Sequence, residues 1–149
     1  MVVTGSNLFN QAWMVLYKTI SGNVTDPVSR GGSAWIFADF PEIQEGKQDD
    51  FPGFPIITID NFENTSSNIT SQKMENNIST VITVHTKDRK TLDTLSSDIH
   101  NALVTSKPTI ISSGLHAMTF SSGGVDTYAF DRNNKIHTKM IGVNFKVNL

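Results

Sequence analysis

Histidines are the residues of this chain best suited to metal or proton chemistry, because the sequence contains no cysteine. They are His85, His100, His116 and His137. None of them stands at the i, i+4 spacing of a helical zinc pair, and none belongs to a recognised motif with a carboxylate. We therefore interpret them as surface or interface histidines and expect no metal site and no cofactor. The lack of cysteine also excludes disulfides and thiol nucleophiles.

Serine hydroxyls are the remaining candidate nucleophiles, at Ser112, Ser113, Ser121 and Ser122. No Gly-x-Ser-x-Gly elbow surrounds any of them. A catalytic triad is recognised by geometry, so an unrecognised hydrolase site stays open as an alternative. The glycine pairs of the chain lack the strand-glycine-helix context of a phosphate-binding loop. The sequence favours a protein that is not an enzyme.

Four carboxylates gather in one Pro- and Gly-broken segment, namely Glu42, Glu45, Asp49 and Asp50. Glycosidase chemistry needs two carboxylates held rigidly a short distance apart, and such a loop is a poor support for that. We interpret the segment as solvated loop charge or as an acidic rim.

A small basic cluster consists of Lys87, Arg89 and Lys90. It lies at the start of an expected helix, where positive charge opposes the helix dipole. The cluster is either a contact for an acidic partner or a solvated corner.

Two amphipathic helices are expected, at residues 7–21 and 89–106. Ser6 is the expected N-cap of the first and Gly22 its stop, and Asp88 is the expected N-cap of the second. Apolar residues recur at helical spacing in both segments, so each helix presents one stripe to a core.

Short β-rich runs separate and follow these helices. The expected strands are residues 34–38, 54–60, 77–86, 109–121 with a break at Gly114, 126–131 and 136–148. Residues 61–76 are expected to be a loop or a ragged extended segment, 121–124 a flexible turn, and 132–135 a tight hairpin turn with Asn-Asn at its centre.

The last strand shows the clearest alternation of the chain. Its apolar residues are Ile141, Val143, Phe145, Val147 and Leu149, and they alternate with Gly142, Asn144, Lys146 and Asn148. One face therefore belongs to the core and the other faces solvent or a partner. Together these patterns predict a single α+β domain over residues 1–149. We expect one mixed, mostly antiparallel sheet packed against two main helices, with a C-terminal β-hairpin.

Composition narrows the class of protein. Charged residues make up 17% of the chain, against roughly 25% in typical globular domains. Ser, Thr and Asn take their place, and a surface with little charge permits self-association. The formal net charge of -2 argues against a dedicated nucleic-acid binder. We expect no signal peptide at the N-terminus and no membrane span.

The layout of the chain resembles the tail terminator proteins of long-tailed bacteriophages, also described as tail completion or neck proteins. The resemblance rests on the N-terminal helix, the run Trp35-Ile36-Phe37 and the aromatic-proline segment at residues 51–59. It continues with Ile82-Thr83-Val84-His85-Thr86, which leads into the second helix, and with the final hairpin.

This resemblance implies a structural virion protein. Six copies would form a ring at the head-proximal end of the tail tube, stop its polymerisation and join the tail to the head connector. The partners would be other copies of the chain, the tail tube protein and the connector, with genomic DNA passing only through the lumen. The location would be the virion, and the host cytoplasm during assembly.

Within that picture, the acidic segment Glu42 to Asp50 would face the lumen or the tube. The ring interface would use residues 61–76, residues 109–124 and the polar face of the last strand, with Asn144, Lys146 and Asn148. Two alternatives stay open: a tail tube or other neck subunit, and a small cytoplasmic binding domain or enzyme.

Overall fold

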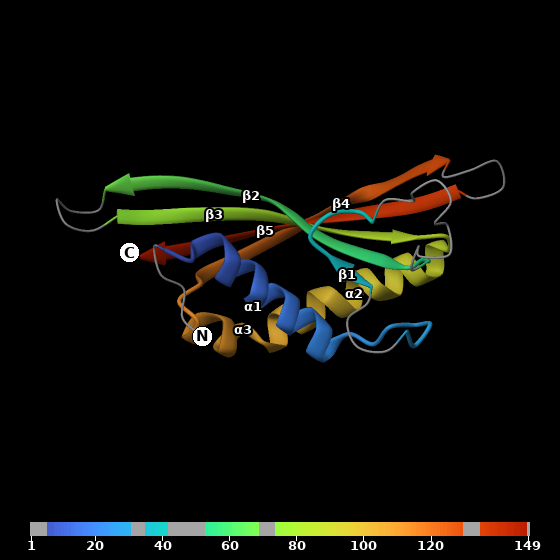
Figure 1. The fold of residues 1–149 in the computed structure, drawn as a ribbon, viewed down its shortest axis with the longest axis horizontal. Helices are drawn as coiled ribbons and strands as arrows, with labels where there is room; N and C mark the ends of the chain where they lie inside the picture. The colour runs from blue at the N-terminus through green and yellow to red at the C-terminus, as the bar shows by residue number, and fades with distance from the viewer. Residues whose placement is uncertain (1–5, 31–34, 42–52, 69–73, 130–134, 149) are drawn as a thin grey trace.

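A computed structural model describes residues 6–30, 35–41, 53–68, 74–129 and 135–148 of the chain. The elements in chain order are α1 (Leu8–Asn23), β1 (Ile36–Phe37), β2 (Ile56–Asn68), β3 (Met74–Thr86), α2 (Arg89–Thr105), α3 (Lys107–Ser112), β4 (His116–Ala129) and β5 (Lys135–Asn148). The strands form one twisted sheet in the order β1-β2-β3-β5-β4, and the helices all lie on one of its faces (Figure 1).

Strand directions confirm the expected mixed sheet. β1 runs parallel to β2, and the other three pairings are antiparallel. The final hairpin joins β4 and β5, and β5 lies between β3 and β4. Two main helices with a mostly antiparallel sheet are the α+β class that the sequence predicts.

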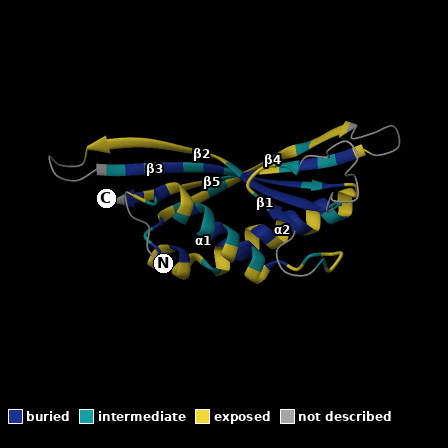
Figure 2. Cartoon of the chain, viewed as in Figure 1, coloured by how far each residue is buried: buried dark blue, intermediate teal, exposed yellow. Residues whose placement is uncertain are grey.

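The core lies between the sheet and the helices (Figure 2). Alternate residues of β3 and β5 point into it, so Ile78 and Ile82 meet Phe145 and Ile141 in register. From the helix side, apolar side chains of α1 and α2 complete it: Leu8, Ala12, Val15, Leu16, Ile20, Leu92, Leu95, Ile99, Ala102 and Leu103. The predicted alternation of the last strand is confirmed for residues 141–147; Leu149 lies outside the described residues.

The boundaries of α1 differ from the prediction at both ends. Its N-cap is Asn7 rather than Ser6, and no side chain caps it. The helix also passes through Gly22 and ends at Asn23. The Nδ2 of Asn23 donates a hydrogen bond to the carbonyl of Thr19, and Val24 is buried beyond it, so packing rather than glycine sets the end.

The second helix begins as predicted. The carboxylate of Asp88 accepts hydrogen bonds from the backbone N–H groups of Lys90 and Thr91, which an N-cap should do. The helix ends at Thr105, one residue before the predicted boundary.

Residues 109–121 were expected to be one strand, and for their first part this is wrong. Residues Lys107–Ser112 form α3, with Pro108 in its first turn, where a missing N–H costs nothing. Ile110 is its buried residue, and Gly114 follows at φ +98°, a conformation that glycine adopts without strain. Tertiary burial of Ile110 therefore outweighs the β propensity of this segment.

Two segments expected to lack regular structure belong to strands. β2 continues to Asn68 and β3 starts at Met74, so most of 61–76 is paired. Residues 121–124 lie inside β4 instead of forming a turn. The register shifts between Asp60 and Glu63 and between Ser122 and Val125, which indicates β-bulges at these points. A bulge leaves the extra residues unpaired and lets the strand continue past the polar residues and glycines. The predicted Asn-Asn turn lies outside the described residues, and only Lys135 of it is seen, as the first residue of β5.

The first two strands also differ from the prediction in where they begin. β1 covers only two residues of the expected 34–38, and Ala34 lies outside the described residues. β2 begins at Ile56, immediately after the cis peptide between Phe54 and Pro55.

Candidate assembly surface

The sheet has one open edge along β2. β1 pairs only with Ile57 and Thr58, so most of β2 has no partner strand on that side in the described part of the chain. The indole N–H of Trp13 donates to the carbonyl of Ile59 at 3.1 Å, directly beyond the point where β1 ends. From Asn61 to Asn68 the edge is exposed except at Phe62.

The other open edge is β4, which pairs with β5 alone. Natural sheets usually protect their edges with lysines, prolines, very short strands or bulges. Residues 61–68 carry one charged side chain, Glu63, and β4 also carries one, Asp126. Neither contains a proline or a lysine. The bulges interrupt both edges, but regular pairing resumes at Glu63–Asn68 and at Val125–Ala129, which are therefore the stretches able to accept another strand.

These two stretches lie at opposite ends of the molecule. The β2–β3 hairpin extends at one end and the β4–β5 hairpin at the other, so the sheet forms two arms (Figure 1). One molecule therefore presents two different unpaired edges in two different directions.

An apolar hollow lies beside the β2 edge. Phe9, Trp13 and Met14 of α1 line it together with Ala38 and Phe62 and enclose about 420 Å³. Phe9 is 44% exposed and meets Phe62 edge-on, with ring centroids 6.3 Å apart. The hollow adds apolar contact area next to the free backbone groups of the edge.

The predicted basic cluster is exposed at the start of α2. Lys87 lies over the ring of Phe54, with its Nζ 5.9 Å from the ring centroid. The hydroxyl and backbone N–H of Thr91 donate to Asp88 and hold the pKa of that carboxylate below its usual range. Asp88 thus places one negative charge among the three positive ones. The predicted acidic residues Glu42, Glu45, Asp49 and Asp50 lie outside the described residues.

Asn144 and Lys146 of β5 lie on the face opposite the helices, because Val143, Phe145 and Val147 point into the core. Ser79 donates a hydrogen bond to Asn144 at 2.6 Å, and Lys146 lies 3.4 Å from Glu75. Asn148 is in register with Glu75, and its side chain is not described. β5 has strands on both sides, so its backbone groups are already hydrogen-bonded within the sheet. Only these side chains could contact a partner.

The described residues contain no group of three or more His, Asp or Glu side chains placed to hold a metal ion. Within the same ranges, no helix combines the length and apolar character needed to cross a membrane.

His85 forms the most unusual polar environment on the face opposite the helices. Its Nε2 lies 3.3 Å from the hydroxyl of Thr58, and its ring meets Phe40 edge-on at 5.0 Å. Its Nδ1 is buried and has no hydrogen-bond partner among the described residues. Burial lowers the pKa of His85 to about 4, so the ring is neutral in the folded protein.

This histidine should make stability depend on pH. The pKa of His85 is about 4 in the folded protein and has its ordinary value of 6.5 in the unfolded chain. Between about pH 4 and pH 6.5 the unfolded chain therefore binds a proton that the folded protein does not. Stability is therefore expected to fall as pH drops from about 6.5 to about 4, by about 1–2 kcal/mol after allowance for partial solvent screening. In His85→Gln this loss should disappear, as measured by urea unfolding at several pH values.

His137→Gln is the matched control, because His137 makes an exposed hydrogen bond to Thr127. Burial, and then the charge of Asp39, raises the pKa of Asp60 on the same face. The contribution of Asp60 to stability therefore increases as pH falls, opposite to that of His85. Comparing His85→Gln with the wild type cancels the contribution of Asp60. Equal pH dependence in His85→Gln and the wild type would contradict the assignment.

Sequence reasoning named residues 61–76 as part of a ring interface but expected an irregular segment, so it missed that 61–68 form an open strand edge. The signal was present: a polar run with one charge beside a long β-branched strand. It also missed the apolar hollow, because helical spacing alone does not show that Phe9 and Trp13 border the β2 edge. No protein-family model matches this chain, and no curated protein is significantly similar to it in sequence.

Proposed function

We propose that this chain is a structural assembly protein that closes into a ring, in the manner of the phage tail terminators that its layout resembles. The observation that carries the proposal is the pair of long, nearly uncharged sheet edges at opposite ends of one molecule. An edge without protection invites pairing with another chain, and a protein that presents two of them is suited to joining its own copies.

Because the two edges differ, the contact between copies is heterologous. The edge at Glu63–Asn68 of one copy would pair with the edge at Val125–Ala129 of the next. A head-to-tail contact of this kind gives a ring if the rotation closes and a filament if it does not. The apolar hollow at Phe9 and Phe62 would bury its surface against the neighbouring copy.

The activity of such a ring is geometric, with no bond made or broken. A ring of six copies would cap the head-proximal end of the tail tube, stop its growth and offer its other side to the head connector. Asn144 and Lys146 lie beside the β2–β3 hairpin on the sheet face opposite the helices, where the next copy or the tube would contact them, and Asn148 follows them at the end of β5. The acidic segment Glu42 to Asp50 would face the lumen, where negative charge keeps passing DNA from binding.

Charge placed on one edge is expected to abolish this assembly. Thr65 and Ser67 are exposed at the free end of β2. In Thr65→Lys/Ser67→Lys, lysines would stand where a neighbouring strand must approach, so ring formation should be lost while the fold is kept. Light scattering over a concentration series, with negative-stain images, measures this.

The matched control is Thr94→Lys/Asn101→Lys, which adds the same charge on the exposed side of α2. It should assemble as the wild type does. Helical tubes instead of rings would favour a tail tube subunit. A wild-type protein that stays monomeric, and that does not cap purified tail tubes, would overturn the proposal.

A further inference from the structure

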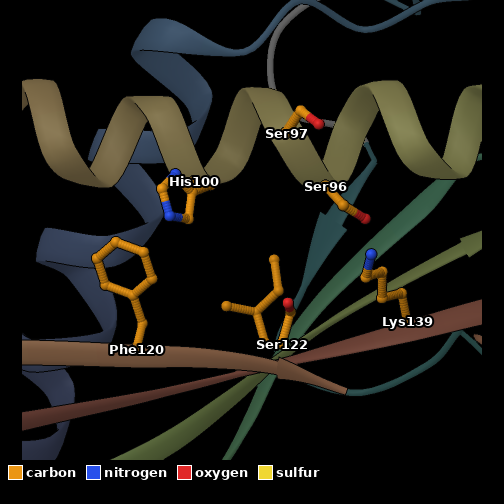
Figure 3. Close-up of a pocket in the computed structure, with 7 residues that line it drawn as sticks. Ser96, Ser97, His100, Phe120, Ser122 and Lys139 are labelled. Carbon is orange, nitrogen blue, oxygen red and sulfur yellow. The ribbon is translucent and has the colours of Figure 1, made fainter. Parts of the chain in front are cut away.

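A second cavity lies on the helix side of the sheet, outside the edge stretches Glu63–Asn68 and Val125–Ala129. It has a volume of about 280 Å³ and lies between α2 and the β4–β5 hairpin. Its lining residues are Ser96, Ser97, His100, Phe120, Ser122, Lys139 and Ile141. Figure 3 shows the serines and His100 of α2 on one side and the side chains of β4 and β5 on the other.

Lys139 is the unusual residue of this cavity. It is in register with Val84 of β3, a core residue, so it belongs to the side of β5 that carries Ile141 and Val143. A lysine that is half-buried as a residue therefore continues a row of apolar side chains. It makes no ion pair within the described residues, and Figure 3 shows it rising from the sheet toward Ser96.

The polar groups around Lys139 are hydrogen-bond donors, and no carboxylate lines the cavity. Ser96 already donates to the carbonyl of Leu92 at 2.7 Å. In the described part of the chain, the hydroxyls of Ser97 and Ser122 have no hydrogen-bond partner. Ser122 of β4 and Lys139 of β5 thus face one small space below Ser96 of α2, whereas Ser97 lies at the rim and points away from it (Figure 3).

The remaining walls are apolar and confine what can enter. His100 meets Phe120 edge-on at 4.6 Å, which closes one end, and Ile141 forms part of the floor. The volume is below the range of roughly 300–1,000 Å³ typical of whole-ligand pockets. The space therefore suits one small group rather than a large molecule.

We propose that this cavity binds a phosphate group, with Lys139 supplying the charge and Ser122 supplying a hydrogen bond. A cation without a counter-ion attracts an anion, and walls that exclude part of the water strengthen that attraction. Lysine binds phosphate as a point charge, and hydroxyl donors complete the contacts to its oxygens. The site is independent of the ring assembly, since none of its residues lies in the two edge stretches Glu63–Asn68 and Val125–Ala129.

The test is a titration of the protein with inorganic phosphate. Binding is monitored by the NMR chemical shifts of the backbone amides and of the His100 ring. The expected shifts cluster at residues 96–100 and around Ser122 and Lys139. Lys139→Gln keeps the length of the side chain and should weaken binding at least about tenfold, with a smaller loss in Ser122→Ala.

Lys146→Gln is the matched control, because it removes a lysine from the same strand on the opposite face of the sheet. It should bind phosphate like the wild type. A second experiment uses a single-stranded oligonucleotide of five nucleotides. If it binds more tightly than inorganic phosphate and its binding also needs Lys139, the phosphate belongs to a nucleic-acid backbone. If only inorganic phosphate binds, the phosphate belongs to a small molecule.

The proposal is overturned if no shifts appear in the cavity, or if Lys139→Gln and Lys146→Gln weaken binding equally. The second result would show general attraction to surface charge. Thermal unfolding of each variant tests whether a loss of binding reflects a loss of fold. If Lys139→Gln does not fold, Ser122→Ala decides the outcome.

Discussion

Replacing Arg30 by alanine is expected to destabilise the fold by about 1–3 kcal/mol, the usual cost of leaving a partly buried, hydrogen-bonded charge without its partner. Arg30 binds Asp26 with two of its nitrogens, Nε at 2.9 Å and an Nη at 3.0 Å. It also donates to the carbonyls of Gly53 and Pro55, and it lies over the ring of Trp35. This one side chain ties the loop after α1 to the segment before β2.

Little solvent reaches this ion pair, since the Arg30 and Asp26 side chains are 14% and 8% exposed. Urea unfolding of Arg30→Ala measures the loss. Arg30→Lys should recover only part of it, because an ammonium cannot make the two-pronged contact with the carboxylate. Arg89→Ala is the control, because Arg89 is exposed at the start of α2. This substitution should change the free energy of unfolding by no more than about 0.5 kcal/mol.

The same variant has a pH signature. Burial alone would raise the pKa of Asp26, but the hydrogen bonds and charge of Arg30 outweigh it and lower that pKa. The stabilisation from the pair is therefore present above the ordinary pKa of 3.8 and is lost as pH falls through the folded value. Without Arg30, burial favours the neutral form of the Asp26 carboxyl. The difference in free energy of unfolding between wild type and variant should therefore become smaller from pH 7 to about pH 3. A gap that stays constant would mean that Arg30 acts through packing and not through charge.

Truncating Phe145 to alanine is expected to cost about 3–5 kcal/mol, because it empties a large space in the middle of the core. Phe145 is 1% exposed and stands in register with Ile78 of β3. It belongs to β5, which has paired strands on both sides, so the surrounding backbone cannot collapse easily into the cavity. Denaturant unfolding monitored by circular dichroism gives the free energy.

Phe145→Leu should cost less than Phe145→Ala, since it keeps most of the volume. The neighbouring variant Lys146→Ala should cost at most about 1 kcal/mol, because Lys146 points to the other face and makes one exposed ion pair. Similar costs for Phe145→Ala and Lys146→Ala would contradict the register of β5, since a slip of one residue exchanges the two faces.

The strongly periodic segments were predictable from the sequence because their patterns report burial directly. Residues 141–147 alternate strictly, and Asp88 precedes an apolar stripe at helical spacing, so both the final strand and the second helix were placed within a residue or two. The α+β class follows from these elements, because each exposes one apolar face that must be covered by another.

The segments without a strong period were mispredicted for a common reason. Ile110 and its neighbours favour strands in isolation, yet they form α3 because burial against the core outweighs local preference. Residues 121–124 contain two glycines that suggest a turn, yet pairing with β5 holds them in β4, where a bulge takes up the irregularity. In both places contacts with residues distant in the sequence decide the local conformation.

The candidate sites depended even more on the tertiary structure. The sequence alone predicted the α+β class and the two amphipathic helices of a chain with no cysteine and little charge. Only the tertiary structure decided that residues 61–68 form an open edge, that the two edges lie at opposite ends, and that Lys139 shares a cavity with Ser97 and Ser122. The reason is physical: periodicity records which residues are buried, whereas a site depends on which elements pack side by side, and strand order and register are set by contacts across the whole chain.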